Sequence, residues 1–186
     1  AAYHATWNSA RSVARQHGMM EVLRRRRWSR RVRAPATPVP SPSELVSAER
    51  IQRFDDVNEG AVIAALLSLG KTVTVLAGTG IVREGVIAAS RGGCLNGHPA
   101  VLPGVRGVDV VEWAALEGRA FGVSTHFVVP SVDAGPIVTA VAVEPLPGEP
   151  FLALRQRIET LQADALTDTA LVVARGEERS TPHDLS

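Results

Sequence analysis

Three polar side chains at the ends of predicted strands could support acyl-transfer chemistry: Asn96, His98 and Asp133. His98 precedes Pro99, and a residue before proline is held in extended geometry, which suits a side chain that must point reproducibly at a substrate. Asparagine offers an uncharged donor to a developing oxyanion, and an aspartate beside a histidine fixes the tautomer of the imidazole. The trio suits attack of a neutral nucleophile on a carbonyl through a tetrahedral intermediate, without a covalent enzyme intermediate.

Each of these residues also has an ordinary structural explanation. Asn96 could satisfy backbone groups in a turn, and Asp133 before Ala-Gly-Pro is a common turn residue. His126 lies inside a predicted strand, where we expect it to pack or to orient a loop rather than to catalyse. A metal site made from His98, His126, Asp133 and Cys94 has no supporting ligand spacing, so we expect none.

The composition is typical of an ordinary globular protein. The chain has 186 residues, of which 45% are hydrophobic and 21% charged. Cys94 is the single cysteine, so an internal disulfide is excluded and a reducing cytoplasm is the expected location. No apolar run reaches the roughly 18 residues of a membrane helix, so no membrane partner is expected.

The charge is distributed unevenly along the chain. Residues 1–53 hold 11 arginines and 3 glutamates, a balance of 11 − 3 = +8, so the remainder carries 1 − 8 = −7. Such a basic arm can bind phosphate or nucleic acid. It is also poor in acidic residues and contains serine, which is typical of a transit peptide.

Periodicity and proline content predict three parts. An arginine-rich helix over 8–28 and a proline-rich connector over 34–43, which cannot be helix or inner strand, make up residues 1–43. A domain over 44–176 follows, and residues 177–186 are expected to form a flexible tail.

Within the central part, helices and strands alternate. Asn58 is the expected N-cap of the first helix and Gly70 its end. This order predicts an α/β fold in three layers, with helices on both faces of a sheet whose first part is largely parallel. The expected helices span 59–69, 82–90 (a helix or a turn), 108–117 and 151–173; the expected strands span 73–76, 93–95, 121–129 and 137–143.

Ligands in open α/β sheets bind beyond the carboxyl ends of the strands. The predicted strands place three segments there: 77–83, 96–107 and 129–136. The last two carry Asn96, His98 and Asp133, so these segments are the expected binding region.

Residues 92–138 resemble the catalytic region of the folate-dependent formyltransferase family. The resemblance rests on Asn-x-His-Pro at 96–99, then Leu-Pro and Arg-Gly, a Gly-x-Ser strand that contains His126, and Asp-x-Gly-Pro-Ile at 133–137. Each piece is short, but all occur in order and at the expected gaps. A weaker resemblance extends over about residues 50–175.

The resemblance implies roles for individual residues. Asn96 and His98 would stabilise the oxyanion formed when an amine attacks the formyl group of 10-formyltetrahydrofolate, and His98 with Asp133 would handle the proton that the amine loses. The pterin ring would be held mostly by backbone hydrogen bonds from two segments. The implied folate-binding residues are Gly78, Gly80, Ile81, Val82, Val129 and Val132.

The family normally begins with a further strand-helix-strand half, and this chain has its arginine-rich segment instead. We therefore expect a truncated, Rossmann-type formyltransferase fold that formylates a small-molecule amine. The apolar edge strand at 73–76 predicts a homodimer. Two alternatives remain open. One is a 10-formyltetrahydrofolate hydrolase of the same fold, and the other is a non-catalytic remnant whose basic arm binds a partner or nucleic acid. The intact trio argues against a remnant, and we do not expect nucleic acid to be the partner.

Overall fold

A computed structural model describes residues 42–177 and residue 180, and it divides the chain into two compact units on either side of the Arg53–Phe54 bond. In the first unit the described elements are α3 (Pro42–Leu45) and η1 (Ala48–Arg50). The prediction that residues 34–43 contain no helix was wrong at the end of this range, because Pro42 begins α3. Proline is tolerated at this position because the first N–H of a helix has no intrahelical partner. The predicted helix at 8–28 and most of the predicted tail lie outside the described residues.

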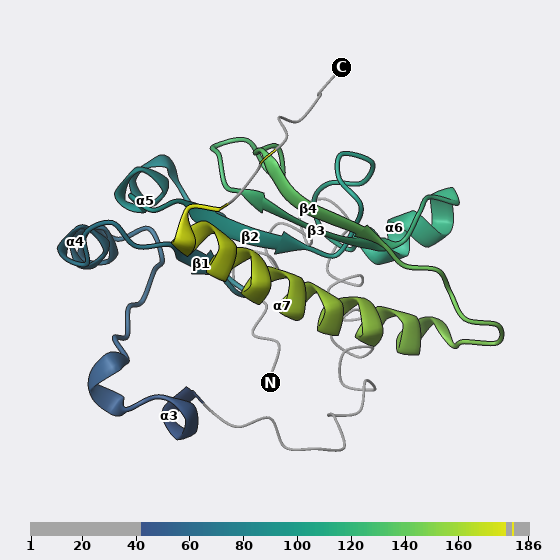
Figure 1. Cartoon of the computed structure of the whole chain (residues 1–186), viewed down its shortest axis with the longest axis horizontal. Coiled ribbons are helices and arrows are strands. Elements are labelled where there is room, and N and C mark those ends of the chain that lie inside the picture. Colours follow the sequence, from purple (N-terminus) through teal and green to yellow (C-terminus); the bar gives the residue numbers. More distant parts are fainter. Residues whose placement is uncertain (1–41, 178–179, 181–186) are drawn as a thin grey trace, which may run out of the picture. The chain divides into compact units, whose positions relative to one another are not determined.

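The second unit is built on a four-stranded mixed sheet with the order β1-β2-β3-β4 (Figure 1). Its first two strands, β1 (Thr74–Leu76) and β2 (Cys94–His98), are parallel. The next two, β3 (Gly122–Phe127) and β4 (Ile137–Ala142), each run antiparallel to their neighbour. Only the first pair is therefore parallel, which agrees with the expectation of a largely parallel first part.

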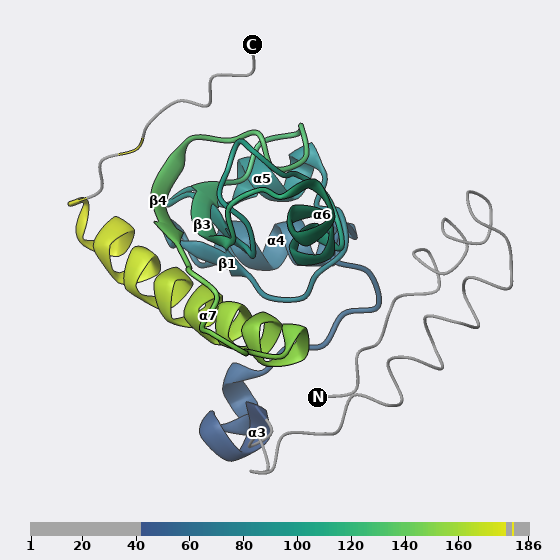
Figure 2. The same ribbon diagram turned by 90° about the vertical axis from the view of Figure 1, so that its right-hand side faces the viewer.

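Helices lie on both faces of this sheet. The long helix α7 (Phe151–Arg175) packs against β2 and β3, and α4 (Gly60–Ser68) and α5 (Glu84–Ala89) lie on the other side of the strands (Figure 2). A shorter helix, α6 (Val110–Glu117), connects β2 to β3, and Gly118 ends it in the left-handed conformation. The predicted α/β architecture is confirmed.

Alternation along the strands decides which side chains can form a site. Leu95 packs with Leu166 and Val173 of α7, and Thr125 of β3 shares a 2.8 Å hydroxyl hydrogen bond with Thr169 of the same helix. Since successive strand residues point to opposite faces, Asn96, His98 and His126 point to the face away from α7. The strands thus separate a hydrophobic core on one face from a polar cluster on the other.

Two predicted boundaries in this unit were wrong. The strand expected to end at Asn96 continues to His98, because Asn96, Gly97 and His98 pair with His126, Thr125 and Ser124 of β3. Antiparallel pairing here overrides the weak strand preference of asparagine and glycine. The N-cap of α4 is Glu59 rather than Asn58, whose side chain is engaged elsewhere.

The helical spacing of Phe151, Leu154, Ile158, Leu161 and Ala165 predicts that these residues face the core, and the structure confirms this prediction in part. Leu154 and Ile158 are buried, with Leu161 and Ala165 packed beside their cluster, but Phe151 is 37% exposed at the first helical position. Cys94 is buried, as expected of a small core residue, and burial raises the pKa of its thiol despite a hydrogen bond from Ser90. Within the described part of the chain, no helix combines the length and apolar character needed to span a bilayer.

Candidate active site

The site centres on Asp133, which lies between two buried histidines. Its Oδ2 is 3.5 Å from Nδ1 of His98, and its Oδ1 is 3.6 Å from Nε2 of His126. The side chain of Asn96 joins them, with Nδ2 at 3.4 Å from Nε2 of His126. The structure therefore brings the three sequence-predicted residues together and adds His126 as a fourth.

His98 is only 3% exposed, and acceptors face both of its ring nitrogens. Its Nε2–H donates to the carbonyl of Val105 at 2.9 Å, while Nδ1 faces the Asp133 carboxylate. With Nε2–H committed to the carbonyl of Val105, a proton on Nδ1 makes the ring a cation and lies directly against the Asp133 carboxylate. This arrangement suits a histidine that accepts a proton during a reaction.

His126 is held on the opposite side of the same carboxylate. Its Nδ1–H donates to the carbonyl of Phe127 at 2.9 Å, and its Nε2 lies 3.4 Å from Nδ2 of Asn96 and 3.6 Å from Oδ1 of Asp133. The expectation that His126 packs or orients a loop agrees with this geometry. Its contact with Asp133 was not predicted, because the two residues meet only through the fold.

Asp133 itself adopts a conformation that is uncommon for a residue with a side chain. Its φ is 48°, in the left-handed region, where a non-glycine residue is unusual and often marks a functional site. Burial alone would raise the pKa of its carboxyl group. Hydrogen bonding to His126, the charge of His98 and the backbone N–H of Gly107 more than offset that effect, so the pKa of Asp133 is lowered.

Hydrogen bonds between segments hold the two loops around the cluster. Ser124 of β3, which is fully buried, accepts from the N–H of Leu102 and donates to the carbonyl of Ala100, both at 2.9 Å. The N–H of Gly107 donates to Oδ2 of Asp133 at 2.9 Å. The loop after β2 is thereby fixed to β3 at one point and to the carboxylate of Asp133 at another.

The loop that carries Asp133 reaches the site differently from what we expected. Because β3 runs antiparallel to β2, its carboxyl end lies beside Cys94, at the other end of the sheet from the ends of β1 and β2. The chain must fold back across the sheet to bring Asp133 over His98. Gly135 allows this return, since a Cβ there would stand 1.8 Å from the carbonyl oxygen of Phe127.

The predicted folate-binding turn follows β1 beside the cluster. Leu76, the last residue of β1, is in register with Asn96, which is in register with His126, so the turn starts next to the polar face. Gly78, Gly80 and Ile81 are exposed, whereas the side chain of Val82 is buried. In the second predicted segment, Val129 is half-buried and Val132 exposed.

Asn58 is the contact that sequence reasoning missed in this turn. Its Oδ1 accepts from the N–H of Arg83 at 2.6 Å, and its Nδ2 donates to the carbonyl of Ile81 at 2.9 Å. The only available signal was the Asp-Val-Asn sequence at 56–58, which resembles the family. Nothing local shows that this amide reaches a segment more than twenty residues away.

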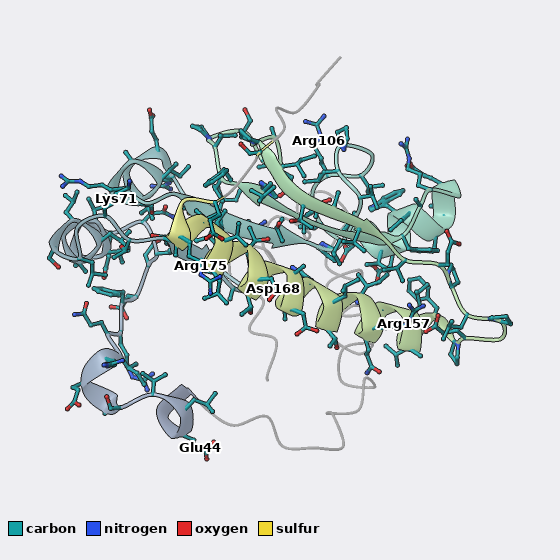
Figure 3. All side chains as sticks on the ribbon, in the orientation of Figure 1. Glu44, Lys71, Arg106, Arg157, Asp168 and Arg175 are labelled. Atoms are coloured by element: carbon teal, nitrogen blue, oxygen red, sulfur yellow. The ribbon has the colours of Figure 1, made fainter. Side chains whose placement is uncertain are left out.

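The arginine of the Arg-Gly motif lies outside the cluster. Arg106 is exposed and projects away from the sheet (Figure 3). It borders an open cavity that also includes Val105, Trp113, Glu117 and Arg119. Among residues 42–177, no group of three or more acidic, histidine or cysteine side chains is arranged to hold a metal ion.

The chain is similar to known proteins in both sequence and fold. The family described as Formyl transferase matches residues 10–170, so the match starts well before the position expected from the motifs. The methionyl-tRNA formyltransferase of Chlorobium chlorochromatii is 28% identical over 159 residues, which cover 85% of this chain and 50% of that protein. The chain thus spans about half the length of the curated relatives it matches.

Solved structures show the same relationship. Glycinamide ribonucleotide transformylase 1 from Symbiobacterium toebii is similar with a TM-score of 0.54 and 29% identity, covering 67% of this chain and 62% of that one. The formyltransferase PseJ from Anoxybacillus kamchatkensis, solved with a formamido sugar nucleotide and tetrahydrofolate, has a TM-score of 0.56. It covers 62% of this chain and 61% of its own, and at 18% identity it supports the fold alone. The matched residues, the fold and these relatives show that this chain belongs to the formyl transferase family.

Proposed function

We propose that this chain transfers a formyl group from 10-formyltetrahydrofolate to the amine of a small-molecule acceptor. The observation that carries the proposal is the buried cluster in which Asp133 lies 3.5 Å from His98 and 3.6 Å from His126, beside the amide of Asn96. The family match supports transfer of a formyl group, and the single cysteine suits a cytoplasmic setting.

Folate recognition would fall to the two segments beside the cluster. Glycines 78 and 80 have open space where a Cβ would stand, which leaves the backbone of the turn accessible. Its backbone groups, with those of residues 129–133, suit the donor and acceptor edge of a pterin. The bound folate would supply the formyl carbon at which the acceptor amine attacks.

The residues of the cluster would divide the chemistry between them. Asn96 would donate its amide N–H to the formyl oxygen as that oxygen gains negative charge. His98 would donate its Nε2–H to the same oxygen by exchanging the carbonyl of Val105 for it. The ionised Asp133 would take the proton released by the amine, directly or through water, and share it with Nδ1 of His98. The same proton would pass to N10 of the folate as the bond from N10 to the formyl carbon breaks, so that tetrahydrofolate leaves and the formyl group stays on the amine.

The test is incubation of the protein with 10-formyltetrahydrofolate and a panel of amino acids, amino sugars and nucleotide-sugars, with mass detection of an added formyl group. Methionyl-tRNA belongs in the same panel, because the curated relatives bear that name. Formylation of a small amine supports the proposal. Formylation of methionyl-tRNA alone would contradict the acceptor class.

Two other outcomes separate the remaining alternatives. Release of formate without any acceptor product would favour a hydrolase, although the relatives named above are transferases and do not favour it. Failure to bind reduced folate, together with salt-dependent binding of nucleic acid, would favour the non-catalytic remnant.

A homodimer is the second part of the proposal. Within the described residues, β1 pairs only with β2 and leaves an edge, and no residue of α4 is buried. Leu69 is 64% and Val75 43% exposed on these two neighbouring segments. An uncovered apolar edge favours pairing with another chain, here a second copy. Light scattering at micromolar concentration checks this, and a stable monomer would contradict it.

A further inference from the structure

The turn proposed to bind folate is held by one side chain, that of Asn58. Its amide makes two hydrogen bonds to the backbone of this turn, accepting from the N–H of Arg83 at 2.6 Å and donating to the carbonyl of Ile81 at 2.9 Å. A carbonyl and the N–H two residues later are the pair that an extended strand presents along one edge. Arg83 is extended, with φ −92° and ψ 165°, so Asn58 acts here like a neighbouring strand.

Asn58 is itself held in place. Its backbone N–H donates to Oδ1 of Asp56 at 2.8 Å, and its Nδ2 lies 3.4 Å from the same oxygen. The N–H of Glu59 donates to the carbonyl of Asp56 at 3.2 Å, which closes a turn before α4. A side chain anchored in this way can impose its geometry on the segment that it contacts.

The consequence lies on the other edge of the turn. Along an extended segment, the polar groups of successive residues point to opposite sides, so the N–H and C=O of Val82 point away from Asn58. Neither group has a hydrogen-bond partner within the described residues, although Val82 as a whole residue is only 7% exposed. Backbone polar groups beside a buried side chain are normally paired, so this donor–acceptor pair is available to a ligand.

Building on the proposed function, we propose that Asn58 is a positioning residue for folate: by holding Ile81 and Arg83, it presents the N–H and C=O of Val82 to the pterin edge. Asn58 makes no contact with the cluster around Asp133 in the hydrogen bonds of the described residues. Its loss should therefore weaken folate binding and leave the chemical step nearly unchanged.

The test compares wild type, Asn58→Ala and Asn58→Asp, with Ser68→Ala as the matched control. Ser68 lies on α4 and its hydroxyl bonds only within that helix, to the carbonyl of Ala65 at 2.7 Å. Calorimetry with 5-formyltetrahydrofolate measures affinity. We expect Asn58→Ala to weaken binding about tenfold, as two lost hydrogen bonds imply, with kcat at saturating folate within about twofold of wild type.

Amide hydrogen exchange of the ligand-free proteins gives an independent readout. Asn58→Ala should speed exchange of the Arg83 amide, whereas Asn58→Asp, which keeps an acceptor for that N–H, should preserve its protection and lose less affinity. If Asn58→Ala does not fold, folate affinity of Asn58→Asp is the deciding measurement. That variant still lacks the N–H that donates to the carbonyl of Ile81. Ser68→Ala should leave both measurements unchanged.

The outcomes separate this inference from the proposed function. Equal folate affinity in wild type and both Asn58 variants, or unchanged Arg83 exchange in Asn58→Ala, would overturn the positioning role while formyl transfer stands. If wild type itself does not bind reduced folate, the proposed function fails, and the positioning role fails with it.

Discussion

The two regions that flank the proposed reaction site are built in opposite ways. The cluster of Asn96, His98, His126 and Asp133 is made of side chains, mostly buried and tied together from β2, β3 and the loop before β4. The turn at 77–83 is largely exposed, offers backbone groups, and is held by the single side chain of Asn58.

The difference follows from what each region would do. A group that moves a proton needs a fixed partner and a controlled pKa, which burial between His98 and His126 gives to Asp133. A surface that recognises the flat polar edge of a ring needs only correctly directed N–H and C=O groups. We therefore expect changes in the cluster to lower the turnover rate and changes in the turn to lower affinity.

The largest expected effect is on turnover by Asp133→Asn. The amide keeps the shape of the side chain but cannot accept a proton, so kcat should fall by about a hundredfold or more, with little change in folate affinity. Steady-state assays with the acceptor found in the panel measure this, and Asp168→Asn on the exposed side of α7 is the control (Figure 3). A folded Asp133→Asn protein with near-normal turnover would remove Asp133 from the mechanism.

The difference between the side-chain cluster and the backbone turn also explains which features could be predicted from the sequence. Asn96, His98 and Asp133 were predicted because side chains that do chemistry leave a pattern of residue types, and the structure brings them together. Leu154 and Ile158 were predicted because helical spacing records a buried face. Both patterns are local in the sequence.

The features that the sequence did not predict depend on contacts between segments that are distant in the chain. Asn58 has the residue type of an N-cap, and only the fold shows that it contacts Ile81 and Arg83. His98 was placed in a loop because asparagine and glycine precede it, whereas pairing with Ser124 keeps it in β2. The backbone groups of Val82 leave no pattern at all, since every residue type except proline carries them.

A pair of glycine variants tests whether the loop of Asp133 and the turn at 77–83 differ in how well they accommodate an added methyl group. In Gly135→Ala the new methyl group would stand 1.8 Å from the carbonyl oxygen of Phe127, so the loop that carries Asp133 must shift. We expect a loss of about 1–3 kcal/mol in the free energy of unfolding, measured by urea denaturation, and reduced turnover. Gly80→Ala, with no atom within 4 Å of its Cβ, should have little effect on stability. An equal loss of unfolding free energy in both variants would contradict the expected difference between the two regions.

The smallest expected effect is a pH dependence that belongs to the cluster alone. Because the pKa of Asp133 is lower in the folded protein than its usual value of 3.8, its carboxylate stabilises the fold. That contribution is complete above the unfolded pKa and is lost as the pH falls through the folded pKa. The difference in unfolding free energy between wild type and Asp133→Asn should therefore change in favour of the variant as the pH falls below the unfolded pKa of 3.8. A difference that moves further in favour of wild type below that pH would contradict the lowered pKa.

The central claim is that the exposed turn and the buried cluster serve one folate molecule. The most direct measurement is a nuclear magnetic resonance titration of the wild-type protein with 5-formyltetrahydrofolate, following backbone amides and the histidine side chains. The account predicts shifts at the amide of Val82, at residues 129–133 and at the rings of His98 and His126, with one common dissociation constant. Shifts confined to other parts of the chain, or separate constants for the turn and the cluster, would contradict it.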